Sequence, residues 1–576
     1  MKLLFRPRDK KYIGGGDLPF GSFDDTGEWL PITKYLEAGA ERFGEKTLFA
    51  VAGADGEETV SHTYKEANGL ANRIAAGLTG GLGVVKGETV GIYMLNRAEF
   101  VLSILGIHKA GAVQVPVNKD EKGERLAYIV NYSGQRVLMT DEESVPLLAD
   151  VAGEIKDLEF VLVASSGGGG KLPEKIGPAK VLPFSFFEKF PAENPPVEVL
   201  VSDTERCMFT SGTTGMPKGV SRNHSGVILT VRAYLEHQGV RSDDVLMTVL
   251  SLAHANAQVM CLFASIATGA SCRIYPRFSA SNFWKWAAQC GATVTNMLGS
   301  VPEYLWAAEP SEFDSKHAVR TVLAGPAPKN RTEFEERFGV RVVEGYGSTE
   351  MGMALWQYAE DFRPGSSGFV TAGYHLEIRD PEDTDRVVRE EWDTERHDSP
   401  PPECVGLLFI RPLIPDTTLN EYFKDPERTK QAFDSEGFFN SDDLFARGVD
   451  GRYYFQGRYS RIRVSGENVD PNAVANTALR HEAVGQAIAL GVRLPEVSDD
   501  EVKLNIVLNP GAQFDHEQFC LWMAEQVPVY MVPRFIQIYE QFPLTSTQKI
   551  NLGALKAVGD ETWDRSGSGI SLKTRK

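Results

Sequence analysis

The segment from residue 210 to residue 219 constrains this chain more than any other. It reads Thr-Ser-Gly-Thr-Thr-Gly-Met-Pro-Lys-Gly and follows an apolar, strand-like run at residues 207–209. Glycines let a backbone approach an anion closely, hydroxyl and backbone N–H groups donate hydrogen bonds to it, and a lysine adds a movable charge. The segment therefore predicts a phosphate-binding loop with Lys218 as its cation. The other predicted phosphate ligands are Thr210, Ser211, Gly212, Thr213, Thr214 and Gly215.

Spacing excludes two common phosphate loops. The segment has neither the Gly-x-x-x-x-Gly-Lys-Ser/Thr pattern of a Walker loop nor the Gly-x-Gly-x-x-Gly pattern of a dinucleotide fold. Taken alone, the segment could also be a polar turn that binds nothing. We favour the phosphate loop, because so many consecutive hydroxylated residues bury poorly without a ligand. The glycine-rich run at residues 165–171 is interpreted as a surface loop, since Leu172 and Pro173 follow its lysine and no helix comes next.

The chain after residue 64 alternates helical and strand patterns. Apolar spacing predicts helices from residue 64 and over residues 98–110, and strands over residues 88–95 and 112–117. Strands that alternate with helices favour βαβ units and a mostly parallel sheet. At 576 residues the chain exceeds the roughly 250–300 residues of a single core. We therefore expect an α/β protein of at least two domains.

A second motif, at residues 344–350, reads Glu-Gly-Tyr-Gly-Ser-Thr-Glu. A flat tyrosine ring stacks well on a base, and a carboxylate suits a hard cation such as Mg²⁺. Together the two motifs resemble the signatures of the adenylate-forming superfamily, which includes acyl-CoA synthetases, nonribosomal adenylation domains and firefly-type luciferases. The resemblance extends over most of the chain. It implies a large N-terminal domain of parallel sheets and helices and a small, mobile α+β C-terminal domain.

The resemblance implies a nucleotide site built from distant segments. Tyr346 would pack on adenine, Glu350 would help to hold Mg²⁺, and Asp443 would accept hydrogen bonds from the ribose hydroxyls. Alone, each of these residues would be an ordinary core or surface side chain. The remaining implied nucleotide-binding residues are Gly325, Ala327, Pro328, Glu344, Gly345, Gly347, Ser348, Thr349 and Arg458.

The resemblance also assigns roles in the last part of the chain. Lys549 matches the catalytic lysine that reaches the acyl carboxylate and the α-phosphate, Arg461 occupies the hinge position, and Gly466 and Glu467 lie at the CoA tunnel. The sequence Gly-Glu-Asn-Val at residues 466–469 is similar to the corresponding segment of carnitine-type and very-long-chain acyl-CoA synthetases. The implied division is residues 1–457 for the nucleotide- and acyl-binding domain, 458–461 for the hinge and 462–576 for the mobile domain.

An acyl pocket is implied near His254, which matches a histidine of the family's acyl site. A hydrogen-bonded core histidine is an equally good interpretation of this residue. The other expected pocket residues are Ala253, Asn296, Leu298, Gly299, Met351 and Gly352. These segments are rich in small and flexible apolar residues, and no charge stands ready to pair with an ammonium group. We therefore expect a bulky, largely apolar carboxylic acid as substrate.

The implied reaction has two halves. A carboxylate attacks the α-phosphate of Mg²⁺-ATP to give an acyl-adenylate and pyrophosphate, and the thiol of coenzyme A then displaces AMP. Lys218, Lys549 and Mg²⁺ would stabilise charge on the transferring group, with Glu350 and His254 as further catalytic residues. The expected small molecules are ATP or a preformed acyl-AMP, Mg²⁺, coenzyme A and the acid.

Several residues depart from the family pattern. Asp442 and Gln548 stand where glycine is usual, Arg461 replaces the usual Asp or Lys, and Ala253 replaces an aromatic residue. Ala473 and Ala475 occupy places that glutamates often hold. Asp442 and Gln548 keep a variant open in which the chain performs only thiol transfer from a preformed acyl-adenylate. A carrier-protein-loading enzyme, a luciferase-like oxygenase and a non-catalytic nucleotide sensor also stay open.

The net charge and the cysteine content limit the kinds of partner and cellular compartment to be expected. A formal net charge of −18 would repel a polyanion, so we expect no nucleic acid partner. Six scattered cysteines without Cys-x-x-Cys spacing indicate reduced thiols, and the chain has neither a signal-peptide pattern nor a transmembrane run. We expect a cytoplasmic protein without a membrane span, either monomeric or homodimeric. The charged segment 380–403 is expected to form a solvated hairpin or loop.

Overall fold

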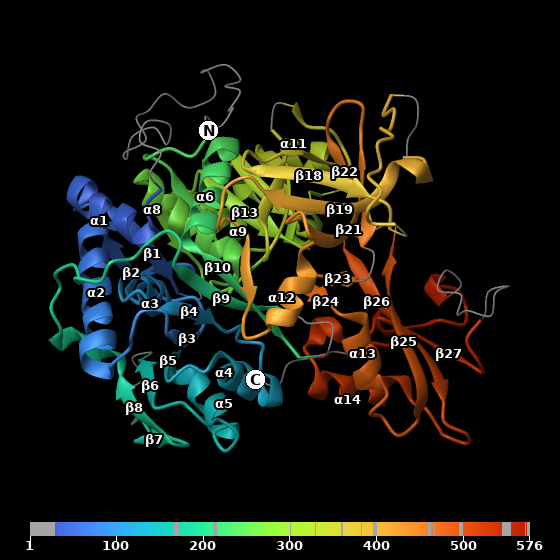
Figure 1. Cartoon of the computed structure of the whole chain (residues 1–576), viewed down its shortest axis with the longest axis horizontal. Helices are drawn as coiled ribbons and strands as arrows, with labels where there is room; N and C mark the ends of the chain where they lie inside the picture. The colour runs from blue at the N-terminus through green and yellow to red at the C-terminus, as the bar shows by residue number, and fades with distance from the viewer. Residues whose placement is uncertain are drawn as a thin grey trace.

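Two large sheets carry most of the chain, and a smaller unit follows them (Figure 1). The structure is a computed structural model of the whole chain. It describes residues 29–53, 55–165, 172–210, 216–299, 301–325, 327–328, 330–358, 361–381, 383–395, 400–458, 462–465, 467–494, 499–543, 555–570 and 572.

The first large sheet has a parallel centre. Strand β3 pairs in parallel with β4 and β5, and the parallel pairing continues through β6 to β8. Helices α3 and α4 connect consecutive strands, which confirms the predicted βαβ units. In sheet order the nine strands among the described residues are β20 (Leu419–Tyr422), β10 (Lys218–Asn223), β9 (Thr204–Thr210), β4 (Val113–Pro116), β3 (Thr89–Tyr93), β5 (Val137–Asp141), β6 (Phe160–Ala164), β8 (Ala179–Pro183) and β7 (Lys175–Ile176).

The second large sheet changes direction at β15. Strands β12, β11, β13, β14 and β15 run parallel, whereas β15 pairs antiparallel with β16, which begins the antiparallel half. In sheet order its strands among the described residues are β18 (Tyr374–Arg379), β19 (Val405–Pro412), β21 (Phe439–Arg447), β22 (Tyr453–Arg458), β17 (Ser366–Val370), β16 (Gly352–Trp356), β15 (Arg341–Ser348), β14 (Thr321–Gly325), β13 (Val294–Leu298), β11 (Val245–Thr248), β12 (Ser271–Ile274), β1 (Thr47–Ala52) and β2 (Glu58–Thr63).

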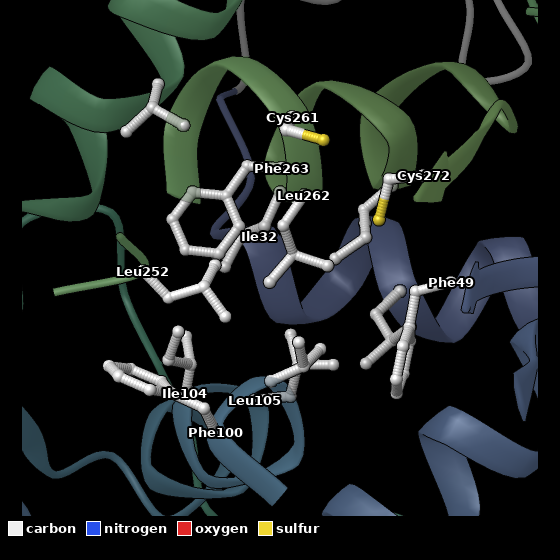
Figure 2. Close-up of a cluster of buried hydrophobic side chains, with 14 of the residues drawn as sticks. Ile32, Phe49, Phe100, Ile104, Leu105, Leu252, Cys261, Leu262, Phe263 and Cys272 are labelled. Atoms are coloured by element: carbon white, nitrogen blue, oxygen red, sulfur yellow. The ribbon is translucent and has the colours of Figure 1, made fainter. Parts of the chain in front are cut away.

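Helices fill the space between the two large sheets. One buried cluster combines residues from β3 of the first sheet, β11 of the second sheet and several helices. Figure 2 shows Phe100, Ile104 and Leu105 of α3 below the π-helix η4, which contributes Leu262 and Phe263. The helices here and elsewhere in the large domain are α1 (Ile32–Phe43), α2 (Tyr64–Ala76), η1 (Gly77–Gly81), α3 (Ala98–Lys109), α4 (Gly123–Ser133), η2 (Glu142–Ser144), α5 (Val145–Asp150), η3 (Phe184–Lys189), α6 (His224–Gln238), α7 (Ala255–Ala257), η4 (Gln258–Phe263), α8 (Ala264–Thr268), α9 (Phe283–Cys290), α10 (Val301–Ala307), η5 (Glu312–Asp314), α11 (Arg331–Phe338), η7 (Pro402–Cys404) and α12 (Pro426–Ala432).

The chain after residue 462 forms a small α+β unit with its own core, drawn in orange and red in Figure 1. Ala473 and Ala475 of α13 are buried in this core, so apolar packing explains why alanines replace glutamates there. Its elements are β23 (Ile462–Val464), β24 (Glu467–Val469), α13 (Pro471–Ala478), β25 (Val484–Arg493), β26 (Asp500–Leu508), α14 (His516–Gln526), η8 (Val529–Met531), β27 (Phe535–Tyr539), β28 (Trp563–Asp564) and η9 (Arg565–Gly567). The predicted fold class, a large α/β domain followed by a small α+β domain, is confirmed.

Several smaller expectations concern loops and cysteines. The charged segment 380–403 begins with a tight turn, in which Arg379 and Val387 form an antiparallel bridge, and residues 382 and 396–399 lie outside the described residues. Residues 166–171 of the expected surface loop also lie outside them. All six cysteines are free thiols, as predicted. Among the helices that the structure describes, none combines the length and the apolar character needed to cross a bilayer.

The packing of α2 against α3 makes a testable prediction at Gly106. A Cβ atom there would lie 2.4 Å from Cγ2 of Ile74 and 3.2 Å from the carbonyl oxygen of Ala71. Alanine gains about 1 kcal/mol over glycine in an exposed helix, but overpacking costs roughly 1–3 kcal/mol. We expect Gly106→Ala to lower the melting temperature.

Gly80 is the matched control, because a Cβ atom there would meet nothing within 4 Å. Gly80→Ala should melt at or above the wild-type temperature. If Gly106→Ala also melts as the wild type does, helices α2 and α3 do not approach each other this closely.

Candidate functional site

The predicted phosphate loop connects two antiparallel strands. Strand β9 ends at Thr210 and β10 begins at Lys218, and these two residues are paired across the strands. Helix α6 starts only at His224, so strand β10 lies between Lys218 and the next helix. The hydroxyl Oγ1 of Thr210 is buried without a hydrogen-bond partner among the described residues. An orphaned donor of this kind suits a bound anion.

The loop lysine meets the carboxylate of the second motif. Lys218 Nζ lies 2.8 Å from Oε1 of Glu350 and donates to the hydroxyl oxygen of Tyr422, also at 2.8 Å. The Tyr422 hydroxyl donates in turn to Glu350 Oε1 at 3.1 Å. The side chains of Lys218 and Glu350 are 11% and 5% exposed. A cation and a carboxylate are thus paired in a largely dry place, where their interaction is weakly screened.

Glycines shape the turn that carries Glu350. This turn connects β15 to β16. Within the turn, Met351 N donates to Ser348 Oγ at 3.2 Å. Gly352 has a φ of 71°, in the left-handed region that glycine adopts without strain. A Cβ atom on Gly347 would lie 2.2 Å from the carbonyl oxygen of Gly352. Both glycines are therefore required for the turn to close this tightly.

Glu350 has the right chemistry for a magnesium ligand. Mg²⁺ is usually held by one or two carboxylates and by phosphate oxygens of the substrate, and seldom by a protein cage. The described residues contain no group of three or more side chains that could hold a metal ion by themselves. A single carboxylate beside a phosphate loop fits Mg²⁺ that arrives with a nucleotide.

The two predicted nucleoside residues also lie together. The hydroxyl of Tyr346 donates to Oδ2 of Asp443 at 2.5 Å, and the edge of the Tyr346 ring packs against Phe445, with centroids 4.8 Å apart. Asp443 lies on β21, where its backbone pairs with that of Arg458 on β22. The residues expected to contact adenine and ribose thus come from two regions of the second sheet that are distant in sequence.

The segment expected beside adenine ends strand β14. Gly325 pairs with Leu298 of β13, and Gly299 N donates to the Gly325 carbonyl oxygen at 3.2 Å. Nearby, burial raises the pKa of Glu344 to about 7, although a hydrogen bond from the Ala327 backbone opposes this. Gly345 belongs to the same strand β15, Thr349 to the turn that follows it, and Pro328 is buried.

Among the expected acyl residues, Leu298 ends β13, Asn296 lies within β13, and Gly352 begins β16. The Tyr234 hydroxyl donates to Oδ1 of Asn296 at 2.9 Å, and both side chains are buried. Ala253 is buried at the start of the segment that leads into η4, and Met351 is fully buried. Asn296 and Tyr234 thus form a buried, hydrogen-bonded polar pair.

His254 contacts the small domain. Its Nε2 lies 3.2 Å from Oε1 of Glu467 on β24 and 3.3 Å from Nδ2 of Asn118. The side chains of His254 and Glu467 are 40% and 33% exposed, unlike a core histidine. Partial desolvation lowers the pKa of His254, but the carboxylates of Glu467 and Asp120 outweigh it and the pKa is raised.

The pKa of Glu467 shifts in the opposite direction, downward. Desolvation raises the pKa of its carboxyl, but the attraction of His254 and Arg463 prevails and lowers it. Both shifts therefore favour the charged forms, so the pair is an ion pair at pH values between the pKa of Glu467 and the pKa of His254. It connects the implied acyl site with the implied CoA tunnel.

Several predicted residues fall where the structure gives no description. They are Ser211, Gly212, Thr213, Thr214, Gly215, Arg461, Gly466 and Lys549. Conversely, no sequence motif pointed to Tyr422, Asn118 or Asp120. Tyr422 lies 204 residues from Lys218 along the chain, and no short motif signals that the two side chains meet.

The backbone at Asp442 offers a prediction. Asp442 has a φ of 63° in a bulge of β21, and its N–H donates to Asn440 Oδ1 at 2.9 Å. A β-branched residue costs about 1–2 kcal/mol in this conformation. We expect Asp442→Val to reduce the free energy of unfolding by that amount in urea, whereas Asp442→Gly stays close to wild type. Equal stability of the valine variant would contradict the left-handed conformation.

Comparisons with known proteins identify the family and the relatives of this chain. Residues 36–392 match the family model described as AMP-binding enzyme. The chain is 27% identical over 523 residues to a crotonobetaine/carnitine–CoA ligase of Escherichia coli, covering 89% of this chain and 96% of the relative. It is 28% identical over 520 residues to a ligase of the same name from Salmonella arizonae, covering 88% and 95%.

Solved structures give the same picture. The anthranilate CoA ligase AuaEII in complex with anthranoyl-AMP aligns with a TM-score of 0.66 at 26% identity, over 91% of this chain and 96% of that one. The amide bond synthetase McbA from Marinactinospora thermotolerans shares the fold, with a TM-score of 0.75 at 20% identity over 92% and 99%. Because the family model spans more than half of the chain, the protein belongs to the AMP-binding enzymes, the adenylate-forming superfamily that its motifs resemble.

Proposed function

We propose that this chain is an AMP-forming acid–thiol ligase, which activates a carboxylic acid as its acyl-adenylate and transfers the acyl group to coenzyme A. One observation carries the proposal: residues assigned to phosphate, metal, adenine and ribose converge from distant segments as two contacting pairs. Lys218 meets Glu350, and Tyr346 meets Asp443. Relatives with CoA ligase in their names support the thiol acceptor.

Each pair has a distinct task in the proposed reaction. Tyr346 and Asp443 hold the nucleoside, so that the α-phosphate stands in line with the attacking carboxylate. Lys218 offers positive charge to the phosphate oxygens, and the hydroxyl of Thr210 donates to them. Glu350 would hold Mg²⁺ together with those oxygens, and the bound ion would neutralise charge that builds on the phosphates.

The contact between His254 and Glu467 supports a domain arrangement suited to thiol transfer. It sets the β23–β24 hairpin of the small domain against the implied acyl site. We propose the division 1–457, 458–461 and 462–576, with rotation about Arg461 exchanging this arrangement for one in which Lys549 reaches the carboxylate. Gly466, next to Glu467, would then leave room for the thiol-bearing arm.

The acid is proposed from the composition of the pocket segments. Residues 252–263, 294–299 and 351–356 contain no Asp, Glu, Lys or Arg. An uncharged, largely apolar acyl group suits such walls, with the Tyr234–Asn296 pair as the polar contact. The names of the relatives include crotonobetaine and carnitine, so a small polar acid is the competing substrate class in any screen.

Two residues, Asp442 and Gln548, motivate the transfer-only variant. Asp442 has a φ of 63°, a conformation that glycine adopts without strain, so this backbone is compatible with either residue. The other residue, Gln548, lies outside the described residues. A carrier-protein acceptor and an oxygenase stay open, and free CoA as sole acceptor and the absence of oxygen uptake would exclude them.

Pyrophosphate exchange tests the proposal. Purified protein, Mg²⁺-ATP, labelled pyrophosphate and a panel of apolar and small polar acids should give exchange with at least one acid, and CoA should then yield the thioester and AMP. Lys549→Ala should lose about 100-fold or more of the exchange rate, as expected when a group that stabilises the transition state is removed. Absence of exchange and of thioester with every acid would contradict the proposal.

The interdomain ion pair predicts a pH effect on the thiol step alone. A raised pKa keeps His254 protonated to higher pH, so the attraction to ionised Glu467 is present below the pKa of His254 and is lost as pH rises through that pKa. Asp120, Glu121 and Arg463 face the same pair. Glu467→Gln should slow thioester formation from the acyl-adenylate more at pH 6 than at pH 8.

Glu525→Gln, at an exposed site on α14, is the matched control and should follow the wild type at both values. Pyrophosphate exchange should be unchanged in both variants. A rate deficit of Glu467→Gln that is equal at the two pH values would refute the role of the charged pair.

A further inference from the structure

The backbone on both sides of Glu350 is held by buried side chains. The guanidinium of Arg222 donates through Nη1 to the carbonyl oxygen of Thr349 at 3.0 Å. The hydroxyl of Tyr374 donates to the carbonyl oxygen of Met351. Arg222 is 2% exposed and Tyr374 4% exposed. The residue before Glu350 and the residue after it are therefore each fixed by a hydrogen bond from outside the turn.

Arg222 also connects this turn to the other partners of Glu350. It lies on β10, the strand that begins with Lys218. Its Nη2 donates to the carbonyl oxygen of Thr417 at 2.9 Å, shortly before β20, which ends at Tyr422. A single guanidinium thus links the three segments that bring Lys218, Glu350 and Tyr422 together.

Two glycines make room for the guanidinium. A Cβ atom on Gly226 would lie 2.5 Å from Arg222 Nη2, and one on Gly352 would lie 3.3 Å from the same atom. The first of these distances is far below van der Waals contact, so alanine at Gly226 would displace the arginine head. The space around Arg222 is shaped for a planar, multiply donating group.

Both clamp residues, Arg222 and Tyr374, keep their donor groups at neutral pH. Burial lowers the pKa of Arg222 to about 10, and the nearby Tyr374, Glu205 and Glu350 oppose this. Burial raises the pKa of Tyr374 to about 12. Arg222 therefore stays charged and Tyr374 stays neutral, and each continues to donate its hydrogen bond.

We propose that Arg222 and Tyr374 are positioning residues that hold Glu350 at the place where its carboxylate binds Mg²⁺ together with nucleotide phosphates. Neither side chain needs to touch the metal ion. Groups that orient a metal ligand are often nearly as important for metal affinity as the ligand itself. The proposal rests on the proposed function, because it requires that ATP binds at this site.

Calorimetric titration of ATP, once with MgCl₂ and once with EDTA, tests the inference without knowledge of the acid. In the wild type, Mg²⁺ should raise the affinity for ATP, and Glu350→Gln should remove that gain. In Tyr374→Phe and Arg222→Met the gain from Mg²⁺ should fall about 10-fold or more, whereas the affinity measured in EDTA should stay within about twofold of wild type.

Tyr64→Phe is the matched control. The buried Tyr64 hydroxyl oxygen lies 2.7 Å from the carbonyl oxygen of Ser265 and 2.7 Å from that of Ala270, away from the site, and its single hydrogen can be donated to either. This variant should lose a similar buried hydrogen bond and keep the full gain from Mg²⁺. If Tyr64→Phe also loses the gain in ATP affinity from Mg²⁺, the loss in the other variants reflects a general destabilisation of the fold and the inference is wrong.

The remaining outcomes are equally decisive. Tyr374→Phe removes one oxygen atom, so it decides the question even if Arg222→Met does not fold. If folded Tyr374→Phe protein gains as much ATP affinity from Mg²⁺ as the wild type does, the inference is overturned. It is also overturned if the variant loses the same amount of ATP affinity with MgCl₂ and with EDTA. If the wild type binds no ATP under either condition, the proposed function itself fails.

Discussion

The site depends on one contact between the two large sheets. Strand β10 belongs to the nine-stranded sheet, and the turn that carries Glu350 belongs to the thirteen-stranded sheet. The ion pair of Lys218 with Glu350 and the hydrogen bond from Arg222 to Thr349 connect them at two points. Since the phosphate loop ends at Lys218, any displacement of one sheet against the other would separate the predicted phosphate ligands from the predicted metal ligand.

Local charge at this contact opposes the charge of the whole molecule. The chain carries a formal net charge of −18, which disfavours the approach of a nucleotide. Lys218 and Arg222 place two cations on one strand beside the loop, where burial keeps solvent screening low. Glu350 balances part of this charge, and the paired arrangement makes both signs tolerable in a dry environment.

The second dependence lies between the domains. His254 of the large domain pairs with Glu467 of the small domain, and Asn118 lies beside the same imidazole nitrogen. An ion pair between half-exposed groups contributes at most about 1 kcal/mol, so it can bias a domain arrangement without locking it. A contact of this strength suits the proposed mechanism, in which the small domain changes its position between the two half-reactions.

The sequence alone explains features that depend on residues close together in the chain, and the tertiary structure explains those that depend on residues far apart. Local patterns predicted the alternating helices and strands after residue 64, the α/β class and the two motifs, because hydrophobic periodicity and glycine spacing act over a few residues. They did not reveal that the predicted phosphate loop is a strand-to-strand connection, nor that Tyr422, Arg222 and Tyr374 contact Glu350 or the backbone beside it. Those contacts join residues that lie far apart in the chain, and only the packing of the two sheets decides which of them meet.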